Sequence, residues 1–118
     1  MRLTSAKLNS EEKKEILKVL FQVVTDLSDE KETEEVLRAV LTENEIISIA
    51  KRIALAKYLS DGLSYAEIKK KLKTSSATIS LIQNQIFKNA GFEIILKKIE
   101  TECWASKWEK KIKKLFNK

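Results

Sequence analysis

Residues 64–88 have the sequence SYAEIKKKLKTSSATISLIQNQIFK, and this stretch decides the fold. Its first part predicts a helix of about two turns, because Ser64 and Glu67 have the spacing of a capping box. Ile68 and Leu72 then lie on one apolar face. A polar break rich in hydroxyl groups follows and is suited to cap a second helix. Two helices joined by so short a turn have the dimensions of a helix-turn-helix.

The second helix of this pair is predicted to present a polar outer face. Ile79, Ile82 and Ile86 recur at spacings of three and four, which turns them inward together. In a helix-turn-helix this second helix enters the major groove, where amides such as Gln83 and Asn84 can pair with adenine. The residues of this segment that we predict to contact DNA are Ser75, Ser76, Ala77, Thr78, Ser80, Gln83 and Asn84.

Lysines surround the same segment and are predicted to hold phosphates, which supply salt-dependent affinity without reading sequence. They are Lys69, Lys70, Lys71, Lys73 and Lys88. Lys73 occupies the turn, where many such units place glycine, so we expect backbone strain there. Residues 1–48 hold 7 basic and 11 acidic side chains, whereas residues 49–118 hold 16 and 6. A polyanion, either nucleic acid or an anionic membrane surface, is therefore a plausible partner.

The flanking sequence predicts further helices and no strands. Apolar stripes indicate helices at about 10–27 and 29–41, and a capping box from Thr42 to Glu45 begins a central helix that ends at Gly62. We expect Asn89-Ala90-Gly91 to close the second helix of the pair. A last helix then begins near Phe92, with Ile94, Ile95 and Ile99 turned inward.

The 118 residues therefore predict one all-α domain, a helical bundle with a helix-turn-helix. Residues 10–60 supply dimerisation and core helices, 64–88 the helix-turn-helix, and 92–118 a C-terminal helix. The chain has no histidine and a single cysteine, Cys103, which excludes a disulfide framework, a Cys/His zinc cluster and a histidine-based triad within one chain. We predict no metal, no cofactor and no enzyme activity. No apolar stretch approaches the roughly 20 residues of a membrane span, and no signal peptide is recognised, so we expect a cytoplasmic protein.

Four stretches resemble the core signature of the tryptophan repressor family, in particular its shorter bacterial members without an established effector. They are Leu41-Thr42-Glu43, Ala50-Lys51-Arg52, residues 59–72 and Ala77-Thr78-Ile79-Ser80. The resemblance implies an intertwined homodimer whose two reading heads bind a palindromic operator, and a repressor function. Helices 10–27 and 29–41 agree with this, because they carry more apolar surface than a small helix-turn-helix needs.

The resemblance also implies an effector pocket. The family forms it from the Leu-Thr before the central helix, an arginine within that helix, and a second arginine after the Ala-Thr-Ile-Ser run. Thr42 and Arg52 match the first two features, but Leu81 replaces the second arginine and Ile82 replaces the glycine that follows it. We therefore expect that tryptophan is not the corepressor. The candidate pocket for another small-molecule effector consists of Leu41, Thr42, Arg52, Leu81 and Gln85.

The C-terminal segment leaves an alternative function open. Trp104, Trp108 and Ile112 share one face with Leu115 or Phe116, opposite Lys107, Lys110, Lys111, Lys114 and Lys118. Such a helix packs its tryptophans onto the protein body, or it docks on an anionic membrane or a protein partner. The alternative is thus a helical dimeric interaction protein. We favour double-stranded DNA over a membrane as the partner, and a buried structural role for Cys103.

Overall fold

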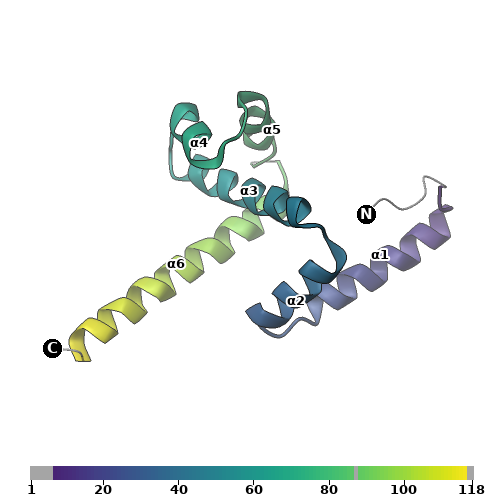
Figure 1. Ribbon diagram of the computed structural model, residues 1–118, viewed down its shortest axis with the longest axis horizontal. Coiled ribbons are helices and arrows are strands. Elements are labelled where there is room, and N and C mark those ends of the chain that lie inside the picture. The colour runs from purple at the N-terminus through teal and green to yellow at the C-terminus, as the bar shows by residue number, and fades with distance from the viewer. Residues whose placement is uncertain (1–6, 87, 117–118) are drawn as a thin grey trace. The chain divides into compact units, whose positions relative to one another are not determined.

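The computed structural model describes residues 7–86 and 88–116, except for the side chains of residues 103–113, 115 and 116. Within these ranges every element is a helix, which confirms the all-α prediction (Figure 1). The helices are α1 (Ser10–Thr25), α2 (Glu30–Val40), α3 (Glu43–Ser60), α4 (Tyr65–Leu72), α5 (Ser76–Ile86) and α6 (Ala90–Phe116). The predictions for the side chains of Cys103, Trp104 and Trp108 lie outside the described residues. Among those that are described, no helix combines the length and apolar character needed to cross a bilayer.

The chain divides into two compact units, Met1–Ile47 and Ser48–Lys118, so the single-domain expectation stays a prediction. In the first unit, helix starts are fixed by capping groups. The amide of Glu12 donates to the Asn9 side chain at 2.8 Å, and the Asn9 amide donates to the Glu12 carboxylate at 3.1 Å. Asp29 caps α2 by accepting from the amide of Glu32 at 2.8 Å. These caps satisfy donors that the first helical turn leaves free.

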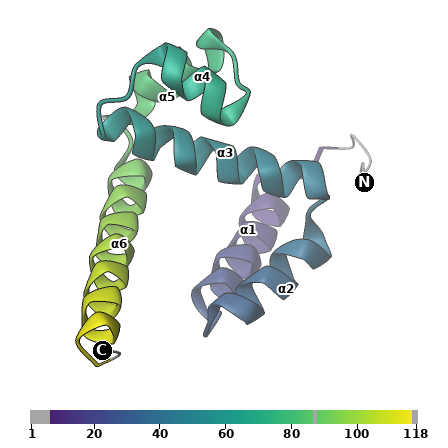
Figure 2. The same ribbon diagram turned by 60° about the vertical axis from the view of Figure 1, so that its left-hand side comes forward.

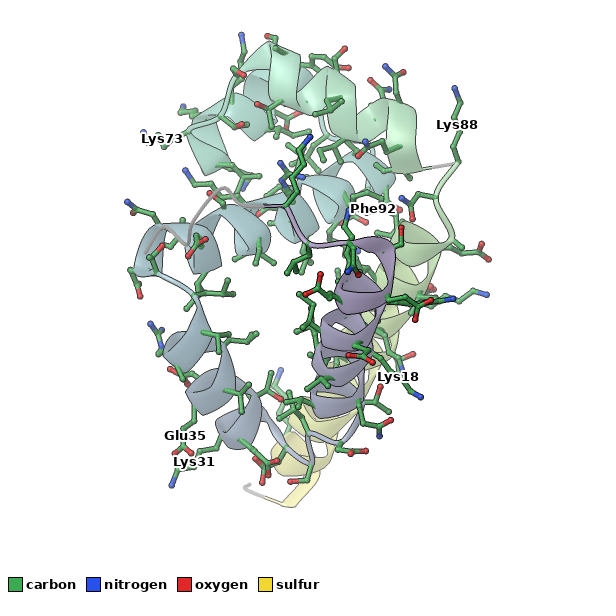
Figure 3. All side chains as sticks on the ribbon, turned by 90° about the vertical axis from the view of Figure 1, so that its right-hand side faces the viewer. Lys18, Lys31, Glu35, Lys73, Lys88 and Phe92 are labelled. Atoms are coloured by element: carbon green, nitrogen blue, oxygen red, sulfur yellow. The ribbon has the colours of Figure 1, made fainter. Side chains whose placement is uncertain are left out.

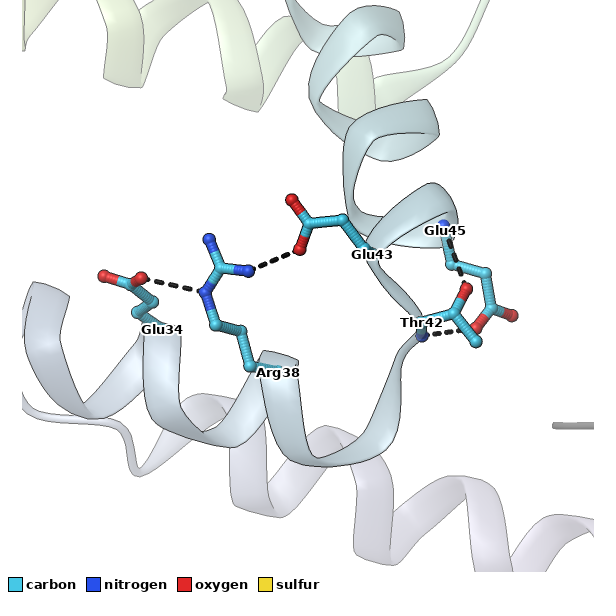
Figure 4. A network of polar contacts seen from close by, with 5 residues as sticks. All are labelled: Glu34, Arg38, Thr42, Glu43 and Glu45. Atoms are coloured by element: carbon cyan, nitrogen blue, oxygen red, sulfur yellow. Dashed lines mark hydrogen bonds and ion pairs between the residues drawn. The ribbon is translucent and has the colours of Figure 1, made fainter.

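A polar network holds the connection between α2 and α3 (Figure 4). Arg38 Nε donates to Glu34 at 2.9 Å, and its Nη1 donates to Glu43 at 2.6 Å. Thr42 and Glu45 form the predicted capping box, with the Thr42 amide donating to the Glu45 carboxylate at 2.7 Å. This amide, followed by the Thr42 hydroxyl, holds the pKa of Glu45 below its ordinary value. The network fixes local geometry; exposed ion pairs of this kind contribute little stability.

The second unit contains the buried core. Leu55 and Ala56 of α3 pack with Ile68 of α4 and with the three inner isoleucines of α5, Ile79, Ile82 and Ile86. Figures 1 and 2 show α4 and α5 lying against α3, while α6 extends away from them as a long helix. The predicted inner face of α5 is therefore confirmed.

Gly62 closes α3 as the sequence predicts. Its φ is +86°, a left-handed conformation that glycine adopts without the steric cost of a Cβ atom. The amide of Gly62 donates to the Leu59 carbonyl, and the amide of Leu63 donates to the Tyr58 carbonyl, both at 3.1 Å. This pair of bonds is a Schellman motif, which ends α3 and sends the chain toward α4.

The start of α6 differs from the prediction. The helix begins at Ala90, so Gly91 lies in its first turn instead of closing α5, and the Asn89 side chain accepts from the Gly91 amide at 2.8 Å. Phe92 and Leu96, four residues apart, pack against the core. Ile94 lies roughly 200° around the helix from each of them and is 58% exposed, so its inward placement was wrong. Ile95 and Ile99 are half-buried.

Candidate nucleic-acid interface

The start of α4 is held by the capping box that the sequence predicts. The amide of Glu67 donates to Ser64 Oγ at 3.2 Å, and the amide of Ser64 donates to the Glu67 carboxylate at 3.0 Å. The second bond, with a smaller contribution from the Ser64 hydroxyl, lowers the pKa of Glu67 from its ordinary value. An ionised Glu67 thus fixes the direction in which α4 leaves the loop.

The turn between α4 and α5 has three residues, 73–75. Lys73 has φ 53° and ψ 49°, so the strained left-handed conformation expected at this lysine is present. Its amide donates to the Lys69 carbonyl at 2.9 Å and completes the last turn of α4. Ser75 then caps α5, because its hydroxyl accepts from the Thr78 amide at 3.2 Å and lies 3.0 Å from the Thr78 hydroxyl. α4 and α5 thus form a helix-turn-helix unit.

The outer face of α5 is open to solvent. Ile79 and Ile82 are fully buried and hold the helix from behind. The predicted base-contacting residues are exposed on the other side: Ser76, Ala77, Ser80, Gln83 and Asn84. Thr78 is half-buried on the flank toward the core, and Leu81 is 50% exposed. The helix therefore presents hydroxyl and amide groups at positions from which a DNA groove can be reached.

The five predicted phosphate-binding lysines are all exposed, and four of them form one set around this face: Lys69, Lys70, Lys73 and Lys88. Figure 3 shows Lys73 and Lys88 at opposite ends of the helix-turn-helix, both directed outward. None of the four forms an ion pair with a carboxylate in the part of the chain that the structure describes. Lys71 differs, because its ammonium lies 5.8 Å from the centre of the Tyr58 ring. That contact directs Lys71 toward α3 and away from the predicted phosphate set.

One contact on this face was not predicted. The hydroxyl of Tyr65, the first residue of α4, donates a hydrogen bond to the side-chain carbonyl oxygen of Gln83 on α5. The two residues are 18 positions apart, and no local pattern in the sequence pairs them. Gln83 is thus oriented by another helix, whereas Asn84 has no hydrogen bond of this kind among the described side chains.

Comparison with known proteins identifies the family. The profile of the family described as Trp repressor protein matches residues 15–100. The chain belongs to the Trp repressor family. It is 33% identical over 89 residues to the "Uncharacterized protein YerC" of Bacillus subtilis (strain 168), which covers 74% of this chain and 86% of that protein. The crystal structure of a TrpR like protein from Eubacterium eligens ATCC 27750 matches with a TM-score of 0.70 and 30% identity. That match covers 78% of this chain and 96% of the other.

Membership of the Trp repressor family indicates a DNA-binding regulator, and the helix-turn-helix of the second unit carries exposed groups suited to this role. The structural match also confirms the TrpR-like fold expected from the sequence. The individual DNA-contacting residues stay predictions.

A cavity of about 260 Å³ lies between α3 and the helix-turn-helix. Arg52, a predicted effector residue, lines it together with Ser48, Lys51, Leu55, Leu72, Thr74 and Thr78. Leu81 and Gln85 do not line it, and both are exposed. Leu41 and Thr42 belong to the first unit, where Leu41 is half-buried and Thr42 caps α3. Within the second unit, Arg52 therefore lines one cavity together with Thr74 and Thr78, and Leu81 does not take part in it.

Proposed function

We propose that this Trp repressor family member is a sequence-specific transcriptional regulator that binds a palindromic operator as a homodimer and acts as a repressor. The observation that carries the proposal is the outer face of α5, which exposes Ser80, Gln83 and Asn84 while Ile79 and Ile82 are fully buried behind it. Exposed lysines without ion pairs to described carboxylates surround that face. This combination supports base contacts from the helix and phosphate contacts from its rim.

Measurements of DNA affinity in two variants separate these two kinds of contact. In Asn84→Ala we expect the binding free energy to weaken by about 1–3 kcal/mol on the preferred operator and to change little on unrelated DNA. In Lys69→Ala we expect weaker binding to all sequences and a shallower salt dependence, by about 0.9 in log–log slope for each lost phosphate contact. Lys31→Ala on α2 is the matched control for charge. The proposal fails if Asn84→Ala and Lys69→Ala both bind every DNA as the wild type does.

The homodimer is supported by the apolar surface of α1. This helix has no buried residue, and Ile16, Val19 and Phe21 are 56%, 63% and 62% exposed. Leu17, Leu20, Val23 and Val24 of the same helix are exposed as well. A contiguous apolar surface of this kind is the usual mark of a protein interface. We infer that the helices of a second copy cover it, as in an intertwined dimer.

Sedimentation equilibrium tests this part of the proposal. Phe21→Glu places a charge on the apolar surface and should weaken the dimer by about 2 kcal/mol or more. Lys18→Gln on the same helix lowers the net charge by the same amount and keeps a good helix former, so it should remain dimeric. A wild type that sediments as a monomer at micromolar concentration overturns the dimer.

We further propose that the regulator does not use tryptophan as its corepressor. Leu81 supplies no charge at the position where the family has a second arginine. The cationic residues that line the cavity in the second unit are Lys51 and Arg52. Its volume of about 260 Å³ is close to the lower end of the usual range for ligand pockets, about 300 Å³. Isothermal calorimetry should give no heat of L-tryptophan binding. A micromolar dissociation constant overturns this statement.

A further inference from the structure

The hydrogen bond between Tyr65 and Gln83 constrains the side chain with the longest reach among the polar groups on the outer face of α5. Tyr65 is half-buried and packs against the core of the second unit, so its ring is held in place. Its hydroxyl donates to the Gln83 Oε1 atom. The constraint thus comes from a rigid group on α4 and acts on an exposed group on α5.

A glutamine side-chain amide that is free to rotate can take either of two orientations, which exchange the places of its oxygen and its nitrogen. The oxygen only accepts hydrogen bonds, whereas the nitrogen carries two N–H donors. When the oxygen accepts from Tyr65, the nitrogen is directed to the opposite side of the amide. Tyr65 therefore selects one of the two orientations, in which the N–H donors of Gln83 face away from α4.

We propose that Tyr65 is a positioning residue that turns the Gln83 amide oxygen toward α4 and its nitrogen toward the DNA, so that each half-site carries a base with a major-groove acceptor and disfavours cytosine at the contacted position. The inference rests on the proposed DNA-binding function. In the major groove guanine offers the acceptors N7 and O6, thymine offers O4 and adenine offers N7, while cytosine offers only the N4 donor. Guanine is the best match, because its two adjacent acceptors face the two N–H groups of the amide.

This assignment revises the expectation that Gln83 pairs with adenine through both amide atoms. That pairing needs the amide oxygen and nitrogen to face the adenine edge together, whereas here the oxygen is turned toward the Tyr65 hydroxyl. Asn84 keeps the original expectation, because no described side chain fixes its amide. The two neighbouring amides of α5 therefore read different bases.

Selection of operators from a random DNA pool tests the proposal with three proteins: the wild type, Tyr65→Phe and Tyr58→Phe. Tyr58 is the matched control, since it is half-buried at the same core but its hydroxyl forms no hydrogen bond with a described residue. We expect the wild type and Tyr58→Phe to disfavour cytosine about tenfold at one position of each half-site. Tyr65→Phe should lose that discrimination, because its Gln83 amide turns freely, and should keep the salt dependence and the thermal midpoint.

Two further variants locate the effect on Gln83. Gln83→Glu carries only acceptors and should select cytosine at the same position. In a Gln83→Ala background, Tyr65→Phe should change no preference. If Tyr65→Phe selects the same operators as the wild type, or still alters selection when Gln83 is alanine, the positioning role is refuted and DNA reading stands. If the wild type selects no sequence at all, the proposed function fails and this inference fails with it.

Discussion

Replacing Lys73 by glycine should stabilise the protein and weaken its DNA binding at the same time. Lys73 has φ 53° and ψ 49° in the turn between α4 and α5. A residue with a Cβ atom loses about 1–2 kcal/mol in this left-handed region. Glycine avoids that cost but has a more flexible unfolded chain, which offsets about 0.5–1 kcal/mol. We therefore expect the free energy of unfolding to rise by about 0.5–1 kcal/mol in Lys73→Gly.

A comparison of Lys73→Gly with Lys73→Ala separates the effect of backbone strain from the effect of the lost charge. Both variants remove the ammonium, but alanine keeps the Cβ atom and hence the strain. For a chain of this size the glycine variant should melt about 2–4 °C above the alanine variant at equal protein concentration. Both should lower the salt dependence of DNA binding by the same step.

Equal thermal midpoints, or a lower midpoint for the glycine variant, refute the estimate of strain at this turn. A glycine variant that binds DNA as tightly as the wild type at every salt concentration refutes the phosphate contact of Lys73. The two outcomes are independent, because one depends on φ and the other on charge. A turn that keeps lysine despite its strain is consistent with a residue retained for contact with a polyanion.

Three other substitutions test the fold around the same unit. Ile82→Ala should lower the free energy of unfolding by about 2–5 kcal/mol, measured by urea denaturation, because Ile82 is fully buried in the core. Gly62→Ala should cost about 0.5–1 kcal/mol in the same assay; no atom lies within 4 Å of the added Cβ, so the cost is the strain at φ +86°, about 1–2 kcal/mol, less about 0.5–1 kcal/mol from the less flexible unfolded chain. In Glu67→Gln, the thermal midpoint should fall less steeply with decreasing pH than it does in the wild type. The folded-state pKa of Glu67 is depressed, so the stability it supplies is present above the ordinary glutamate pKa of about 4.3 and disappears as pH falls through the folded value.

The features that the sequence predicts well are those whose chemistry is local. The capping boxes of Thr42 and Ser64 need a partner only three residues away, and both are present. The inner isoleucines of α5 follow from helical periodicity, and the strain at Lys73 follows from a turn too short to avoid it. Each of these signals is complete within one helix and its flanking residues.

The features that were missed depend on how helices pack against each other. The bond from Tyr65 to Gln83 exists only because α4 and α5 pack against each other, and spacing along the chain does not specify that distance. The start of α6 was misplaced because Gly91 has the sequence signature of a helix end. The Asn89 side chain competes with that signal by accepting from the Gly91 amide, so the new helix starts at Ala90, two residues before the expected Phe92.

The distribution of buried side chains links folding, assembly and DNA affinity. All fully buried side chains among the described residues lie in the second unit, whereas α1 and α2 bury none. Isolated helices shorter than about 12–15 residues are marginal in water; α2 with 11 residues is below this length, and α1 with 16 is only just above it. Their order therefore depends on what covers them, and in the proposed dimer a partner chain would do so only at concentrations that support the dimer. If two reading heads bind the operator as proposed, operator binding would stabilise the dimer in turn, since two linked equilibria must affect each other by the same factor.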